Sequence, residues 1–171
     1  MMATRAETMN VSVKEPRACS EQERAEFREL VLKSGEVQKR GLEELIENAQ
    51  ALAFMRIDAK LVGIAALKRP RDSYRNRVFT ETRAKYAPEG FRHELGWVFV
   101  VPEQQGKGYS RPLVEALVGG SKDLYIYATS KTDNTAMHRT LARYGFEREG
   151  QPRQSSKRQE QLLLFVRKPN P

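Results

Sequence analysis

The spacing of hydrophobic and polar residues changes several times along the chain, and each change predicts a new element. Residues 10–15 alternate apolar and polar side chains, which is typical of a short strand. Ser20, with Glu23 three positions later, forms a capping box, and apolar residues then recur at helical spacing as far as Gly35. A second helical pattern covers about residues 37–48. The N-terminal part is therefore predicted as one strand followed by two helices.

Two β-like runs, residues 51–58 and 60–68, meet at the tight Asp58-Ala59 connection and predict an antiparallel hairpin. From residue 69 to residue 92 the periodicity disappears, and we expect a long loop. With Lys68 included, this loop carries eight basic residues against three acidic ones. Long connections in a compact domain tend to be functional, so the loop is a candidate binding segment, with a solvated face as the competing interpretation.

The C-terminal part returns to strong periodicity, with strands and helices in alternation. A strand, a helix and a second strand in succession imply a parallel crossover. The predicted fold is therefore α/β (α+β), a mixed sheet whose first half is antiparallel, in a single domain over residues 1–171. The predicted elements here are strands at 94–101, 123–129 and 161–167 and helices at 113–120 and 133–144.

Composition narrows the class of protein. Thirty basic residues against twenty-two acidic ones give a formal net charge of +8, which favours an anionic partner. The single cysteine, Cys19, cannot form an internal disulfide, as is usual in a reducing compartment. No apolar run approaches the roughly 18 residues of a membrane span, and the N-terminus lacks the apolar core of a secretory signal. We therefore expect a soluble, cytoplasmic protein with no membrane partner.

A glycine-containing stretch at residues 105–110, QGKGYS, connects a predicted strand to a predicted helix. It is not a P-loop, because Val101 stands where that motif has its first glycine, and Arg111 replaces the third glycine of a dinucleotide fingerprint. A helix N-terminus leaves backbone N–H groups unpaired, and glycines let a ligand approach them closely. The stretch therefore predicts a backbone cradle for a pyrophosphate, with a plain strand-to-helix turn as the competing interpretation.

Three positions of this stretch match a known pattern. Gln105, Gly108 and Ser110 resemble the acyl-CoA-binding signature of the GNAT superfamily of N-acetyltransferases, Gln/Arg-x-x-Gly-x-Gly/Ala, with serine at the last position. Further along, Asn134 and Gly145-Phe146 resemble the second half of the same fold, in which an asparagine opens a helix and Gly-Phe begins the next strand. Two matches in the right order support the resemblance better than either one alone.

The resemblance covers roughly residues 50–166 and implies both a fold and a co-substrate. The fold is a mixed sheet with splayed parallel strands at its centre and helices on both faces, and the co-substrate is acetyl-CoA, whose pantetheine arm lies between the splayed strands. No metal is implied, and His93 and His138 are too few for a metal cluster. The residues that would hold acetyl-CoA are Val98, Phe99, Val100, Gln105, Gly106, Lys107, Gly108, Tyr109, Ser110 and Asn134.

The resemblance also implies direct attack of an amine on the thioester, which requires a general base. Glu94 begins the strand ahead of the glycine stretch, where members of the superfamily often place a carboxylate, and we predict it as the base. A salt-bridged or surface carboxylate is the competing interpretation. Many members carry a tyrosine as the acid seven residues after the asparagine, but Leu141 stands there. Tyr144, about one turn further on, is the predicted substitute, with Ser130, Tyr127 or water as alternatives.

The leading hypothesis is an acetyl-CoA-dependent N-acetyltransferase that acts on a primary amine of a small, amino-acid-like acceptor in a ternary complex. Arginines of the predicted loop indicate a carboxylate or phosphate on that acceptor, because guanidinium groups match such anions with paired hydrogen bonds. These arginines are Arg69, Arg71, Arg75 and Arg77.

Three other functions stay open at this point. One is acetylation of a peptide or protein amine, and another is a non-catalytic acyl-CoA-binding module, which the leucine at position 141 favours. Nucleic-acid binding ranks last, because only the net charge supports it and no motif of that class is present. Assembly as a homodimer is left open.

Overall fold

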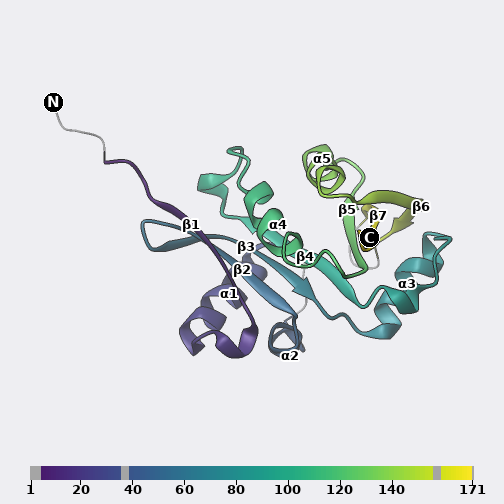
Figure 1. Cartoon of the computed structure of the whole chain (residues 1–171), viewed down its shortest axis with the longest axis horizontal. Coiled ribbons are helices and arrows are strands. Elements are labelled where there is room, and N and C mark those ends of the chain that lie inside the picture. Colours follow the sequence, from purple (N-terminus) through teal and green to yellow (C-terminus); the bar gives the residue numbers. More distant parts are fainter. Residues whose placement is uncertain (1–4, 36–38, 156–158, 171) are drawn as a thin grey trace.

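The computed structural model describes residues 5–35, 39–155 and 159–170, which form a mixed sheet covered by helices (Figure 1). The strand order is β1-β2-β3-β4-β5-β7-β6. The strands are β1 (Met9–Lys14), β2 (Ala51–Ile57), β3 (Lys60–Lys68), β4 (His93–Val100), β5 (Ile126–Lys131), β6 (Glu147–Gln154) and β7 (Gln161–Arg167). The α-helices are α1 (Glu21–Lys33), α2 (Leu42–Glu47), α3 (Asp72–Glu81), α4 (Ser110–Val118) and α5 (Thr135–Arg143).

The centre of the sheet is its irregular part. In the described sheet, β4 and β5 are the parallel neighbours, and they pair at two positions, His93 with Ile126 and Glu94 with Tyr127. The other neighbouring strands are antiparallel. Beyond Glu94 and Tyr127 the ladder between β4 and β5 stops, so the two strands separate. The predicted mixed sheet, with an antiparallel first half and splayed parallel strands, is confirmed.

Helices cover both faces of this sheet, as predicted. α1 packs on β3 and β4 and against α2, whereas α4 packs across β1 to β4. Figure 1 shows α1 and α2 on one side of the sheet and α4 and α5 on the other. Phe27 of α1 and Phe54 of β2 are buried edge to face, with ring centroids 5.5 Å apart, and Leu113 of α4 has no exposed surface. Burial of such apolar side chains is the main contribution that stabilises the fold.

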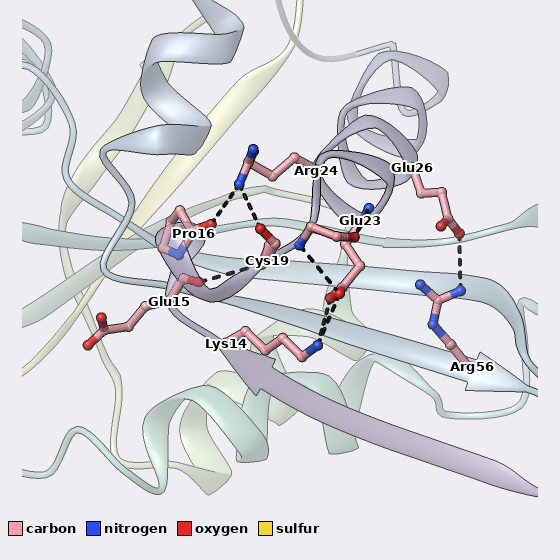
Figure 2. Close-up of polar contacts among 9 residues, drawn as sticks. Lys14, Glu15, Pro16, Cys19, Glu23, Arg24, Glu26 and Arg56 are labelled. Atoms are coloured by element: carbon pink, nitrogen blue, oxygen red, sulfur yellow. Dashed lines mark hydrogen bonds and ion pairs between the residues drawn. The ribbon is translucent and has the colours of Figure 1, made fainter.

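Polar contacts fix the start of α1 to the first strand (Figure 2). Ser20 Oγ accepts a hydrogen bond from the Glu23 N–H at 3.1 Å, and Glu23 also forms an ion pair with Lys14 of β1 at 2.9 Å. Arg24 Nη1 donates to the carbonyl oxygen of Cys19 at 2.7 Å. The reciprocal bond from the Ser20 N–H to the Glu23 side chain completes the cap. The capping box predicted at Ser20 is therefore confirmed.

The hairpin between β2 and β3 also follows its prediction. Asp58 and Ala59 connect the two strands with positive φ values of 48° and 71°. Positive φ at both central residues is typical of the two-residue turns that match the twist of a hairpin.

The predicted long loop at residues 69–92 is wrong in one important respect, because α3 occupies Asp72–Glu81. Val78 and Phe79 of this helix are buried, and Tyr74 packs against the same small cluster. These apolar residues have helical spacing, but two arginines and an asparagine separate Tyr74 from Val78 and hide the pattern. The part of this segment that carries Arg75 and Arg77 is thus a helix rather than a loop.

Two other elements differ from prediction. The polar sequence of β6 does not predict a strand, because β6 lies at the edge of the sheet and Arg153 is its one buried residue. α2 starts at Leu42, after Gly41 with a φ of 78°, and not near residue 37. Residues 36–38 lie outside the described part of the chain.

Candidate active site

The separation of β4 and β5 opens into a cavity with a volume of about 450 Å³. Residues of β4, β5, α3, α5 and the C-terminal hairpin line it. Volumes of this size are typical of sites for small molecules. The side chains that matter most for its chemistry are Lys68, Tyr74, Arg77, Glu94, Ser130 and Arg153.

A β-bulge in β4 forms one wall of the cavity. Ile64 of β3 pairs with Phe99 and Ala66 pairs with Gly96, so Trp97 and the residue after it face a single residue of β3. Trp97 has a φ of 51°, which is unfavourable for a bulky residue. Bulges interrupt the ladder and are common beside active sites, where strained backbone is maintained by the surrounding structure. The backbone of β4 is therefore diverted from β3 where it borders the cavity.

Glu94 is the acidic group of β4 in this cavity, and it is 3% exposed. Its Oε1 accepts a hydrogen bond from Lys68 Nζ of β3 at 2.8 Å. Lys68 Nζ also lies 4.6 Å from the centre of the Trp97 ring. Glu94 Oε2 makes no hydrogen bond of normal geometry with a described residue, although the phenols of Tyr74 and Tyr127 lie close enough to interact with this carboxylate. The ammonium group compensates the buried negative charge, and the second oxygen is left to accept a hydrogen bond from a ligand.

Gly96 leaves room for this ion pair. It stands two positions after Glu94 and so faces the same side of β4. A Cβ at this position would lie 2.9 Å from Lys68 Cδ and 3.5 Å from Glu94 Oε1. Any side chain here would have to displace the lysine.

Two tyrosines lie beside Glu94. The negative charge of Glu94, together with burial, raises the pKa of Tyr74 above its usual range. Burial, followed by the charge of Glu94, raises the pKa of Tyr127. Both phenols therefore keep their protons at neutral pH and can donate hydrogen bonds. Tyr74 lines the cavity, whereas Tyr127 is fully buried against Phe79, with ring centroids 5.4 Å apart.

The four arginines that the sequence suggests for anion binding have different surroundings in the structure. Arg69 donates to a glutamine side chain, and Arg75 forms an ion pair with Asp72 at 3.3 Å. Neither of these residues lines the cavity, nor does Arg71. Arg77 does line it, and its guanidinium carbon lies 5.9 Å from the centre of the Tyr74 ring.

α3 is held on β6 by contacts that are distant in sequence. Arg153 Nε donates to Glu81 Oε2 at 2.7 Å, and the Gln151 N–H donates to the Thr82 carbonyl oxygen at 2.8 Å. Gly150 has a φ of 69°, and a Cβ there would lie 2.1 Å from that same carbonyl oxygen. Glycine is therefore required where β6 meets the end of α3. We call the cavity-lining residues on this side the α3 wall: Tyr74, Arg77 and Arg153.

Residues 105–110, here called the glycine turn, lie between β4 and α4. Gly106 and Gly108 have φ values of 80° and 76°, and a Cβ on either would meet nothing within 4 Å. Gln105 Nε2 donates to the Val100 carbonyl oxygen at 2.8 Å, which fixes the turn to the end of β4. Among the described groups, the backbone N–H groups from Gly106 to Ser110 have no acceptor. The turn thus presents unpaired donors at the start of a helix, as an anion-binding site requires.

The remaining residues predicted to hold acetyl-CoA lie in two places. Val98 and Asn134 line the cavity, and Asn134 Oδ1 also caps α5 by accepting from the Met137 N–H at 3.2 Å. Phe99 and Val100 pair with β3. The glycine turn itself does not line the cavity but lies beyond the C-terminal end of β4.

The predicted acid, Tyr144, does not line the cavity, and its buried hydroxyl has no hydrogen-bond partner among the described residues. Leu141 does line it. So does Ser130, whose buried hydroxyl is likewise without a described partner. Tyr74 and Lys68 are cavity residues that the sequence does not single out as site residues. Helical spacing of Tyr74 with the buried residues of α3 is the signal that could have found the tyrosine.

The cavity, the bulge and the glycine turn fit one class of ligand. A ligand with a pyrophosphate can use the unpaired N–H groups of the turn, and its extended arm can enter the separation between β4 and β5. These features are the ones expected of a coenzyme-A-dependent acyltransferase. The sequence model of the acetyltransferase (GNAT) family matches residues 17–146, and the chain belongs to this family. It is therefore an acetyl-CoA-dependent acyltransferase.

Solved structures share the fold at low sequence identity. An acyl-CoA N-acyltransferase from Pseudomonas aeruginosa is 15% identical, with a TM-score of 0.69, and the match covers 94% of this chain and 99% of that one. A GNAT acetyltransferase from Streptococcus agalactiae is 12% identical, with a TM-score of 0.67 and coverage of 94% and 96%. The yncA protein from Salmonella typhimurium, solved with acetyl-CoA, is 17% identical, with a TM-score of 0.64 and coverage of 96% and 95%. These likenesses establish the fold alone.

No curated protein matches the chain by sequence. Among the described residues, no helix has the length and apolar content of a membrane span, and no cluster of three or more His, Cys, Asp or Glu residues could bind a metal ion. The acceptor of the acetyl group must therefore be inferred from the cavity itself.

Proposed function

We propose that the protein transfers the acetyl group of acetyl-CoA to a primary amine of a small-molecule acceptor, with Glu94 as the general base. The observation that carries this proposal is the hydrogen bonding of the two oxygens of the Glu94 carboxylate. One oxygen is held by Lys68 at 2.8 Å, and the other is buried and unpaired in a cavity bordered by the β4 bulge. An unpaired carboxylate oxygen in a small cavity is suited to accept a proton from a bound amine.

The donor side of the site is proposed at the glycine turn and the splayed strands. Acetyl-CoA supplies the thioester whose carbonyl carbon receives the amine. The backbone N–H groups of Gly106 to Ser110 would bind its pyrophosphate, and Lys107 adds a positive charge. Val98 and Asn134 would contact the pantetheine arm in the cavity. Backbone N–H groups at the bulge would stabilise negative charge on the thioester oxygen.

Glu94 and Tyr74 provide the path for the proton in this proposal. Glu94 Oε2 accepts the proton that the amine must lose. This uptake removes the negative charge that is the first cause of the raised pKa of Tyr74. Tyr74 thereby becomes a better donor at the moment when the leaving sulfur needs a proton, and the protonated Glu94 can restore the phenol. The amine proton is thus passed to the thiol through two side chains, and both return to their starting state.

Two other groups compete with Tyr74 as the proton donor. Ser130 lines the cavity with an unpaired hydroxyl, but a serine hydroxyl is a much weaker acid than a phenol. Tyr144 carries the right group but does not line the cavity. Tyr74 combines a phenol, a place in the cavity and proximity to Glu94.

The test is amine-dependent release of the free thiol from acetyl-CoA, measured over a broad panel of primary amines. We expect turnover with the wild type, a fall in kcat of about a hundredfold or more in Glu94→Gln, and unchanged affinity for acetyl-CoA. Glu115→Gln, which removes the same charge from an exposed position of α4, is the matched control. Full activity of Glu94→Gln would assign the base elsewhere. Binding of acetyl-CoA without transfer to any amine would favour a non-catalytic module.

A further inference from the structure

The charged side chains that line the cavity are more positive than negative. Lys68 is paired with Glu94 at 2.8 Å, and Lys131 is paired with Glu160 at 3.3 Å. These two ion pairs use both carboxylates among the described lining residues. Two arginines of the lining are left to be accounted for.

Arg153 has a partner outside the cavity lining. It is 5% exposed, and its guanidinium bonds Glu81 at 2.7 Å in the contact that fixes α3 to β6. Arg153 therefore contributes to the structure of the wall, and its charge is compensated.

Arg77 is the remaining cation of the cavity. Its side chain is exposed, its guanidinium carbon lies 5.9 Å from the centre of the Tyr74 ring, and it forms no ion pair with a described acidic group. A guanidinium group has five donors in a planar fork, so Arg77 can bind an anion with two hydrogen bonds. One uncompensated positive charge balances the single charge of a carboxylate, whereas a doubly charged phosphate would leave a net negative charge in the cavity.

The placement of Arg77 relates it to the proposed base. Arg77 and Tyr74 are three residues apart on α3 and therefore share a face of that helix. Tyr74 lies beside Glu94, whose charge raises the pKa of the phenol. A molecule that extends along this face from Glu94 to Arg77 would present an amine at one end and an anionic group at the other.

We propose that the acceptor is a primary amine that carries a carboxylate, and that Arg77 binds this carboxylate while Glu94 receives the amine. The proposal rests on the proposed acetyl transfer and specifies its substrate class. Arg77 in this role determines specificity through ground-state binding. Its removal should therefore act mainly on KM for carboxylated amines and much less on kcat.

The experiment compares L-amino acids with their carboxamides in the wild type and in Arg77→Gln, with thiol release from acetyl-CoA as the readout. We expect Arg77→Gln to lower kcat/KM for the preferred amino acid by about tenfold or more and for its amide by less than about twofold. Because the wild type and the variant are compared on the same acceptor, the different basicity of the amino acid and its amide does not affect the result. Arg77→Lys, which keeps the charge and loses the fork, should fall between the two.

Arg71→Gln is the matched control, since it removes the same charge from an exposed position at the start of α3, outside the cavity. Arg71→Gln should leave kcat/KM unchanged for both acceptors. Equal losses for the amino acid and its amide in Arg77→Gln would overturn the carboxylate proposal and leave acetyl transfer standing. Absence of turnover with every amine, carboxylated or not, in a protein that binds acetyl-CoA, would overturn both.

Discussion

The glycine turn lies outside the cavity and the α3 wall lines it, and the two regions are built in opposite ways. In the glycine turn the backbone presents the unpaired donors, and a Cβ on Gly106 or Gly108 would meet nothing within 4 Å. In the α3 wall side chains present the polar groups that line the cavity, and Gly150 allows a close backbone contact that positions the helix. Changes in the glycine turn should therefore affect ligand binding with little loss of stability. Changes that undock the α3 wall should affect both.

The largest effect that tests this difference comes from two alanine substitutions. Gly150→Ala places a Cβ 2.1 Å from the Thr82 carbonyl oxygen at a φ of 69°, and we expect a loss of roughly 3 kcal/mol or more in the free energy of unfolding. Gly108→Ala has a similar φ of 76° but open space, so its cost should be about 1 kcal/mol. Denaturation in urea measures both values. Equal costs would contradict the distinction between the two glycines.

A second test sharpens the description of the α3 wall by comparing two tyrosines. Tyr74→Phe removes the phenol beside Glu94, and we expect kcat to fall about tenfold or more, with unchanged affinity for acetyl-CoA. Tyr144→Phe removes a buried hydroxyl that lies outside the cavity lining. Its kcat should stay within about twofold of the wild type. Steady-state kinetics with a saturating amine measures both, and the reverse result would return the role of proton donor to Tyr144.

The smallest effect concerns the pH dependence of stability at the start of β4. Burial first, and then the charges of Arg69 and Arg92, lower the pKa of His93. The unfolded chain therefore binds a proton at this residue more readily than the folded chain does. This difference in proton binding does not affect stability above the ordinary histidine pKa of about 6.5. The free energy of unfolding falls as the pH falls below that value.

His93→Gln should remove this part of the acid destabilisation. As the pH falls from about 8 to about 5, the wild type should lose more free energy of unfolding than His93→Gln does. Denaturant titrations at both pH values measure it. A constant gap would show that His93 has the same pKa in both states.

The two regions also differ in how well the sequence predicts them. The glycine turn is local: its glycines, the strand before it and the helix after it are consecutive, so the pattern alone predicts its geometry. Glu94 is also placed by its position on a predicted strand. The sequence does not predict that Glu94 is buried, because Lys68, which compensates its charge, stands 26 residues away on another strand.

The α3 wall depends on contacts that no local pattern contains. Glu81 and Arg153 are separated by 72 residues, and β6 is an edge strand whose side chains are mostly exposed. Without β6, the short apolar stripe of α3 is too interrupted to predict a helix. The sequence therefore does not show which of the four arginines lines the cavity. Only the three-dimensional structure shows that Arg77 is the one that does.

The central claim is that the glycine turn binds acetyl-CoA independently of the α3 wall. Calorimetric titration of acetyl-CoA into the wild type, Gly108→Glu and Arg77→Gln tests it most directly, with Gly120→Glu as a control in open space. We predict equal binding by the wild type, Arg77→Gln and Gly120→Glu. Gly108→Glu should not bind, because its carboxylate repels the pyrophosphate. Normal binding by Gly108→Glu, or loss of binding in Arg77→Gln, would contradict the claim.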